Sequence, residues 1–270
     1  MPGAYAEPTG QSQAVPGGVY TWQVPVGATD VSYNQKPVLI VNNHALVSIH
    51  INSKPGIGVV QYALDGPQSH EFVISGKQYT EQHITLQNQA MVDPPQDTLK
   101  RIREESARQG KLYRAYAPQQ RVSEGFMQPL EGIVTSLFGH RRFFNGKPRR
   151  PHSGLDIAAD EGTPIYAAGD AEVTLADELY FNGKTVFLDH GQGLITMYCH
   201  LSEYLVEEGD NVAKGQSIGL VGATGRATGP HLHWTVSLNG TRVDPQIFMS
   251  ALNAITSPAQ TQANEHTDAP

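Results

Sequence analysis

Four residues in two short stretches could together hold a metal ion. His152 and Asp156 stand four positions apart, and His231 and His233 stand two positions apart. On an extended strand, residues at even separations share one face, so each pair could aim both side chains into one groove. Imidazole nitrogen and carboxylate oxygen are ordinary zinc ligands, and a catalytic zinc uses three protein ligands and leaves one position for water. Either pair alone is weak evidence, because histidines and aspartates at such spacings are common at surfaces, and the expectation of a catalytic metal site depends on the sequence around them.

Short strands and tight turns surround these residues. Apolar runs at 185–188 and 194–198 flank a Gly-containing turn at 189–193, which is typical of a β-hairpin. The sequence has no His-Glu-x-x-His element, so no glutamate is an obvious general base and histidine must take that role. The metal site is therefore expected on strands and turns, not on a helix.

The rest of the chain predicts a mainly β protein with more than one part. Short β-branched runs separated by turn residues predict an amino-terminal β-sandwich domain over residues 17–92. A capping-type start at Asp97 and charges at helical spacing predict a helix to about residue 110 or 116, within a helical linker at 93–129. Residues 1–16 and 251–270 are expected to be mobile tails, since the first sixteen residues and those from about Ser257 onward are rich in Pro, Gln, Thr, Ala and Gly and have almost no large apolar groups.

Composition excludes several classes of protein. A net charge of -7 over 270 residues argues against a nucleic-acid binder, which normally needs a surplus of Lys and Arg. No run of eighteen apolar residues occurs, so no transmembrane segment is predicted, and the first residues lack a basic and apolar leader. The single cysteine, Cys199, cannot form an internal disulfide and is compatible with either redox compartment.

Three stretches of the second half carry a family resemblance. They are His-Ser-Gly-Leu-Asp-Ile-Ala-Ala at 152–159 with the strand at 162–170, Tyr-Cys-His-Leu-Ser at 198–202, and the Gly-rich run 222–233 closed by Asp244-Pro245. In order and spacing this part resembles the lysostaphin-like (LytM-type) zinc metallopeptidase family over roughly residues 130–248. The resemblance implies an antiparallel β-sheet zinc metallopeptidase domain at 130–250.

The same resemblance implies roles for five residues. His152, Asp156 and His233 would bind one zinc ion per chain, while His200 and His231 would be the catalytic pair beside the metal-bound water. The implied activity is endopeptidase cleavage of the peptide part of bacterial peptidoglycan, with D,D-crosslinks as the first choice of bond and a glycine-containing bridge as the second. Which histidine is the general base stays open.

A basic run precedes the first ligand, against the acidic balance of the chain. Its members include Arg149 and Arg150. They are either solvated loop charges or contacts for the free carboxylates of the stem peptide, which arginine can bind through two parallel hydrogen bonds. Cys199 is expected to be a packing residue because neighbours on a strand face opposite ways.

Two other functions remain open for this sequence. The chain could be a non-hydrolytic activator or binding module of cell-wall hydrolases, or a structural zinc domain, although a structural site normally has four protein ligands. The amino-terminal domain carries no motif, and its short connection allows it to dock on the catalytic groove. A peptidoglycan substrate implies a periplasmic or secreted protein whose leader has been removed.

Overall fold

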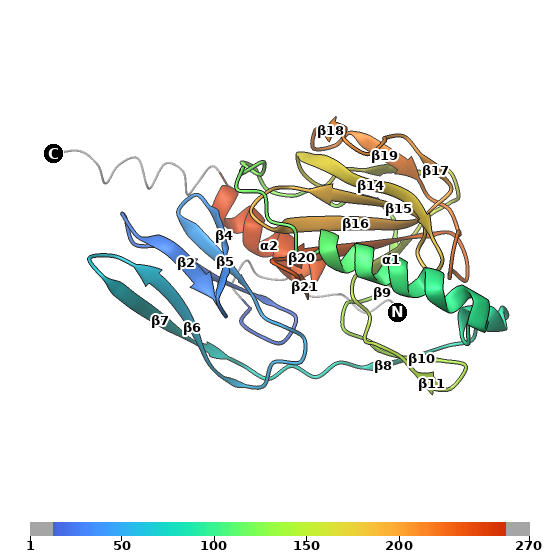
Figure 1. Ribbon diagram of the computed structural model, residues 1–270, viewed down its shortest axis with the longest axis horizontal. Coiled ribbons are helices and arrows are strands. Elements are labelled where there is room, and N and C mark those ends of the chain that lie inside the picture. Colours follow the sequence, from blue (N-terminus) through green and yellow to red (C-terminus); the bar gives the residue numbers. More distant parts are fainter. Residues whose placement is uncertain (1–12, 258–270) are drawn as a thin grey trace, which may run out of the picture.

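The computed structural model describes residues 13–257, so residues 1–12 and 258–270 of the tails expected at 1–16 and 251–270 lie outside this range. Two small sheets form the amino-terminal part (Figure 1). The first has the order β1-β5-β4 and the second the order β3-β2-β6-β7. The strands are β1 (Val19–Gln23), β2 (Thr29–Tyr33), β3 (Lys36–Pro37), β4 (Leu39–Val41), β5 (His44–Ser48), β6 (Gly56–Ala63) and β7 (Pro67–Ile74).

Both small sheets contribute side chains to one apolar cluster, which includes Val47 of β5 and Phe72 of β7. The β-sandwich itself stays a prediction. Residues 13–16, expected in the tail, are already tied to these sheets, because the Gln13 amide donates to Val19 O and the Ser75 amide to Ala14 O.

A large antiparallel sheet forms the second half of the molecule, in the order β18-β14-β15-β16-β20-β12-β9 with β21 paired to β20. Its strands are β9 (Ile133–Ser136), β12 (Leu155–Ala158), β14 (Ala171–Leu179), β15 (Gly183–Asp189), β16 (Leu194–Leu201), β18 (Asn211–Val212), β20 (His231–Leu238) and β21 (Thr241–Val243). The predicted mainly β, antiparallel fold is confirmed, and the predicted hairpin is β15 and β16. Every residue of β16 is buried, because both faces of this central strand are covered.

Two three-stranded sheets flank the large one. One has the order β13-β19-β17, with β13 (Pro164–Tyr166), β17 (Glu203–Tyr204) and β19 (Ser217–Leu220). The other has the order β11-β10-β8, with β8 (Glu81–Ile84), β10 (Arg141–Phe144) and β11 (Lys147–Pro148). The chain leaves β7 and runs along the molecule to place β8 beside β10 in a parallel pair (Figure 1).

Two 3-10 turns, η1 (Gln89–Met91) and η2 (Gln96–Thr98), lead into helix α1 (Leu99–Leu112). The helix expected in this part of the chain is therefore present. None of its residues is buried, and it contacts the large sheet through Leu112 and through polar side chains. Arg108 pairs with Asp177 at 2.6 Å, and Arg101 Nη2 donates to Glu178 O at 3.0 Å.

Helix α2 (Pro245–Thr256) corrects the expected boundary of the carboxyl-terminal tail. Residues 251–256 belong to this helix, since Ala251, Leu252 and Ile255 are buried on one of its faces. The Asp244 side chain accepts a hydrogen bond from the amide of residue 246, and Pro245 occupies the first turn, where a missing amide costs nothing.

Helix α2 also joins the two halves of the molecule, as it lies between the first small sheet and the large sheet (Figure 1). Phe248 and Leu252 share one apolar cluster with Leu39 and Leu46 of the first sheet and with Trp234 of β20. Burying each such side chain stabilises the fold by about 1.5–3 kcal/mol. Among the residues described, no helix is both long and apolar enough to span a membrane.

Candidate metal centre

Two neighbouring strands of the large sheet carry two of the predicted ligands. Asp156 on β12 lies directly opposite His233 on β20 in antiparallel register. Directly opposed residues point to the same face of a sheet, with Cβ atoms about 4.5–5.5 Å apart. His231 lies two residues before His233 on β20 and so shares this face.

His152 reaches the same point from a loop. Strand β12 begins only at Leu155, so the expectation that His152 and Asp156 share the face of one strand is wrong. Two backbone hydrogen bonds fix the loop instead: the Gly139 amide donates to His152 O at 2.8 Å, and the His152 amide donates to His140 O at 2.9 Å. The side chain of His152 is only 1% exposed.

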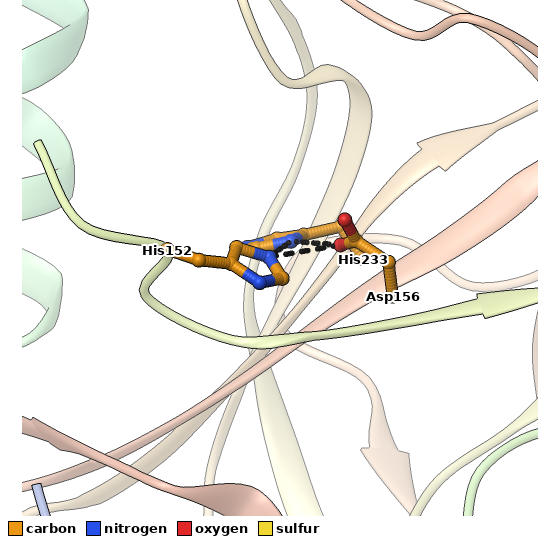
Figure 2. Close-up of side chains that lie close together, drawn as sticks. All are labelled: His152, Asp156 and His233. Carbon is orange, nitrogen blue, oxygen red and sulfur yellow. Dashed lines mark hydrogen bonds and ion pairs between the residues drawn. The ribbon is translucent and has the colours of Figure 1, made fainter. Parts of the chain in front are cut away.

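The three predicted ligands meet in one cluster (Figure 2). Asp156 Oδ1 lies 3.0 Å from His152 Nε2 and 2.7 Å from His233 Nδ1, and the two ring nitrogens are 3.0 Å apart. Zinc bonds nitrogen and oxygen at about 2.0–2.2 Å, so donor atoms this close can share one ion. That they bind zinc remains a prediction.

Hydrogen bonds on the far side of each ring indicate which nitrogen carries the proton. His152 Nδ1 lies 2.7 Å from Leu137 O, so this nitrogen donates and Nε2 keeps its lone pair toward the cluster. His233 Nε2 lies 3.0 Å from Thr235 Oγ1, which favours a lone pair on Nδ1. With the Asp156 carboxylate, three electron pairs face one another, an arrangement that a cation stabilises. Two imidazoles and one carboxylate also match a donor set of catalytic zinc.

Burial keeps both rings of the cluster neutral. It lowers the pKa of His152 and lowers that of His233 to about 4. For the Asp156 carboxyl, burial alone would raise the pKa, but any proton that enters the cluster is held by His152 or His233, whose charge and hydrogen bonds would stabilise the carboxylate, so the pKa lies well below its usual range. The three groups are therefore in the deprotonated forms that a metal requires.

His200 and His231 lie beside the cluster. Their ring centroids are 4.7 Å apart, and the ring of His200 is 6.2 Å from that of His233. Each Nδ1 lies 2.8 Å from a backbone carbonyl, that of Thr224 for His200 and that of Gly229 for His231. Each Nε2 therefore keeps a lone pair. Burial, followed by repulsion from the neighbouring histidines, lowers the pKa of His200 to about 3.

Strand β16 is distorted where it carries His200. Its φ angle is +66°, a value uncommon outside glycine, and the register between β15 and β16 shifts at the same place. Such bulges re-aim a side chain and are frequent next to active sites. The amide of His200 donates to Asn182 O at 2.9 Å. Cys199 faces the opposite apolar cluster, as expected of a packing residue, and burial raises the pKa of its thiol to about 12.

Two side chains that touch the predicted ligands were not identified from the sequence. Arg142 Nη2 donates to Asp156 Oδ2 at 2.6 Å, and Ser136 Oγ lies 3.1 Å from His152 Nδ1. Arg142 belongs to the basic run before His152, but only the fold shows that this member of the run contacts a predicted ligand. Nothing in the local sequence distinguishes Ser136.

Arg149 and Arg150 do not join the cluster. Arg149 Nη2 donates to Val92 O at 2.8 Å and lies 3.5 Å from Asp93 Oδ1, while Arg150 is exposed. Their expected contact with substrate stays a prediction.

Comparison with known proteins agrees with this geometry. Residues 150–245 match the model of peptidase family M23. The solved structure of a Pseudomonas aeruginosa protein assigned to peptidase M23 is 39% identical and superposes with a TM-score of 0.72, over 90% of this chain and 97% of the other. The chain belongs to peptidase family M23. The resemblance found in the sequence is confirmed.

Two further relatives of this M23 chain are longer proteins. The peptidoglycan DD-endopeptidase ShyC of Vibrio cholerae is 45% identical over 114 residues, which is 42% of this chain and 26% of the relative. The DD-carboxypeptidase/endopeptidase Mpg of Neisseria meningitidis is 39% identical over 132 residues, which is 49% of this chain and 29% of the relative. The M23 chain thus matches little more than a quarter of the length of these two proteins.

Proposed function

We propose that the chain is a zinc-dependent endopeptidase that hydrolyses amide bonds in the peptide part of bacterial peptidoglycan, with D,D-crosslinks as the preferred bond. The observation that carries this proposal is the convergence of His152, Asp156 and His233 on one point, with His200 and His231 beside it. The names of the relatives from Vibrio cholerae, which are peptidoglycan DD-endopeptidases, support the substrate class.

The first task of these residues is to hold the metal. His152, Asp156 and His233 supply three donor atoms, which leaves room in a tetrahedral site for one further group. Zinc, when bound, polarises a carbonyl group and lowers the pKa of water to about 7.

The second task is proton transfer. His200 and His231 direct Nδ1 to backbone carbonyls, so the Nε2 lone pair of each ring is free to accept a proton from water. A histidine in this position can return the proton to the leaving amine and typically contributes 10²- to 10⁴-fold to the rate. Burial keeps His200 unprotonated at neutral pH, because it lowers the pKa to about 3.

The alternative of a non-hydrolytic activator is weaker, since all five positions are filled. A structural zinc domain is weaker too, because such sites are normally closed by four protein ligands and this cluster offers three.

Digestion of purified peptidoglycan tests the proposal. We expect the zinc-loaded chain to cut crosslinked stem peptides, to lose this activity with a chelator, and to regain it with zinc. Mass spectrometry of the new termini distinguishes a cut crosslink from a cut bridge or a released terminal residue. Absence of any new terminus with fully zinc-loaded protein would refute the endopeptidase. Because peptidoglycan lies outside the cytoplasmic membrane, we propose a periplasmic or secreted location.

We also propose that the amino-terminal part docks at the rim of this site through residues 86–93, here called the strap. Three successive strap carbonyls accept hydrogen bonds from three loops of the peptidase part. The pairs are Tyr180 Oη with Ala90 O at 3.2 Å, Arg226 Nη1 with Met91 O at 3.4 Å, and Arg149 Nη2 with Val92 O at 2.8 Å.

The loops that hold the strap also lead to the site. Arg149 lies three residues before His152, and Arg226 lies in the Gly-rich run before His231. Leu86 and Val92 pack on Phe144 in a small apolar cluster. The strap therefore occupies donors that a peptide substrate could use, among them Arg149, whose proposed substrate contact requires the strap to leave.

Weakening the strap tests the docking. In the double variant Val92→Ser with Asp93→Ala, the strap loses its apolar anchor and its ion pair with Lys147, which is 2.6 Å long. We expect a several-fold faster digestion of wall fragments with unchanged zinc affinity. Asp97→Ala, outside the strap, is the control. Equal rates for the double variant and the parent chain would contradict a blocking role.

A further inference from the structure

Strand β8, which precedes the strap, brings one polar side chain to the support of the metal centre. In the parallel pairing of β8 with β10, Gln82 lies opposite Arg142. The pairing is fixed at both ends, because the Arg141 amide donates to Thr80 O at 2.9 Å and the Asn145 amide donates to Ile84 O at 3.0 Å. A residue from the amino-terminal part is thus held beside the strand that leads to the predicted ligands.

Gln82, Ser136 and Arg142 form a closed ring of hydrogen bonds. Gln82 Oε1 accepts from Ser136 Oγ at 2.9 Å and from Arg142 Nε at 3.0 Å. Arg142 Nη2 also donates to Ser136 Oγ at 3.0 Å. Because the serine hydroxyl gives its proton to Gln82, its lone pairs are left for other donors.

Two members of this ring of hydrogen bonds contact predicted ligands. Arg142 Nη2 donates to Asp156 Oδ2 at 2.6 Å, which leaves Oδ1 as the oxygen that faces the two imidazoles. Ser136 Oγ lies 3.1 Å from His152 Nδ1, the nitrogen opposite the one that faces the cluster. The side chains of Arg142 and Asp156 are only 16% and 10% exposed, so water competes little for these bonds.

We propose that Gln82 is a positioning residue for the metal centre. By accepting from both Ser136 and Arg142, it sets the orientation of the two groups that in turn orient His152 and Asp156. Loss of such outer partners typically lowers metal affinity by about 10- to 100-fold. The amino-terminal part therefore contributes to metal binding, separately from any effect of the strap on substrate.

Charge and geometry act in opposite directions at Arg142, which makes Gln82 the better position to test. The guanidinium repels a divalent ion, while its hydrogen bond orients the carboxylate that binds the ion. Gln82 is neutral, so replacing it with an apolar residue of similar size changes the geometry of the ring without removing a charge.

The test is the zinc dissociation constant of the full chain, measured by competition with a chromophoric chelator. We expect Gln82→Leu to raise this constant about 10- to 100-fold. Gln82→Glu keeps an acceptor oxygen and is expected to stay within about threefold of the parent chain. His83→Ala is the matched control, since its exposed ring stacks on Phe143 at 4.7 Å and has no contact with the ring of hydrogen bonds.

A double-mutant cycle separates positioning from a general loss of fold. Ser136→Ala should also weaken zinc binding, and its combination with Gln82→Leu should weaken binding by less than the product of the two single effects. Thermal unfolding without metal checks that each variant folds. An unchanged zinc constant in folded Gln82→Leu, an equal loss in His83→Ala, or fully multiplicative effects in the cycle would overturn the proposal. The proposal rests on metal binding at the proposed site and not on peptidoglycan cleavage, so the two can fail separately.

Discussion

The large sheet buries histidines in two places whose hydrogen bonds are completed in different ways. His190, at the turn after β15, is 1% exposed and has a partner on each nitrogen. Its Nδ1 lies 2.8 Å from Asp170 O and its Nε2 lies 2.8 Å from Thr196 Oγ1. The hydroxyl of Thr196 donates a hydrogen bond to Tyr198 Oη at 3.2 Å, and Tyr198 Oη also accepts a hydrogen bond from the Ala168 amide. This place is a closed network.

At the candidate metal centre the network is open. His152 and His233 each have a partner on one ring nitrogen, while the other nitrogen faces Asp156 Oδ1. Burial lowers the pKa of His190 and that of His233 to about 4, so both rings are neutral and their protonation does not distinguish the two sites. The convergence of three donor atoms on one point does, and it supports the proposal that a cation binds at this centre.

The substitution with the largest expected effect removes the carboxylate of the open network. Asp156→Ala removes the only anionic donor of the cluster, and we expect loss of bound zinc and a fall of peptidoglycan hydrolysis by at least about a thousandfold. Asp177→Ala is the control, because this carboxylate on β14 is 46% exposed and pairs with Arg108 in a surface contact. Metal analysis together with digestion rates checks the result, and a variant that keeps zinc and activity would contradict the ligand assignment.

The proposed catalytic pair should behave differently from the proposed ligands. We expect His200→Ala and His231→Ala to retain zinc while kcat falls by about 10²- to 10⁴-fold, the range for general acid–base catalysis. Inductively coupled plasma mass spectrometry of the purified variants gives the zinc content beside the rate. If either variant lost the ion as well, that histidine would be a ligand and the division of roles between the two groups would be wrong.

Much of this site could be predicted from the sequence because its residues stand in short, ordered stretches. The spacing of His231 and His233 fits one strand face, and both residues lie on β20. The family resemblance of these stretches predicts the three ligand candidates. Their convergence depends on the register of β12 with β20, which brings Asp156 opposite His233 and which no local pattern encodes.

The supporting residues could not be predicted, for a physical reason. Gln82 and Arg142 are sixty positions apart and meet only because β8 pairs with β10. His152 was expected on a strand, but its loop is held by backbone bonds to residues 139 and 140, which leave no side-chain signal. Helix α2 differs, because the Asp244-Pro245 start and the apolar residues at helical spacing after it are local sequence signals of a helix.

A matched pair of substitutions sharpens the comparison of the two histidine sites. Thr235 and Thr196 each contact the Nε2 of a buried histidine, His233 and His190 respectively, and both are 0% exposed. We expect Thr235→Val to raise the zinc dissociation constant about tenfold or more. Thr196→Val should leave this constant unchanged and lower the free energy of unfolding by about 1–3 kcal/mol, the cost of a buried group left without its partner. Equal effects on zinc binding would remove the distinction between the sites.

The smallest expected effect concerns the pH dependence of the closed network. The pKa of His190 is about 4 in the folded chain, because burial disfavours the charged ring, and about 6.5 when unfolded. Above pH 6.5 both states are neutral and the group contributes nothing. As the pH falls from 6.5 toward 4, only the unfolded state takes up the proton, so stability is lost in this window.

His190→Gln removes this titration while keeping a side chain that can hydrogen-bond. Between pH 7 and pH 5 the parent chain should therefore lose about 2 kcal/mol more unfolding free energy than the variant. Denaturant titrations at both pH values, with saturating zinc so that metal binding is common to both proteins, give the difference. Parallel losses would mean that His190 is protonated in the folded chain near its ordinary pKa. In that case its closed network admits a proton, and the metal centre would be the only one of the two sites that excludes it.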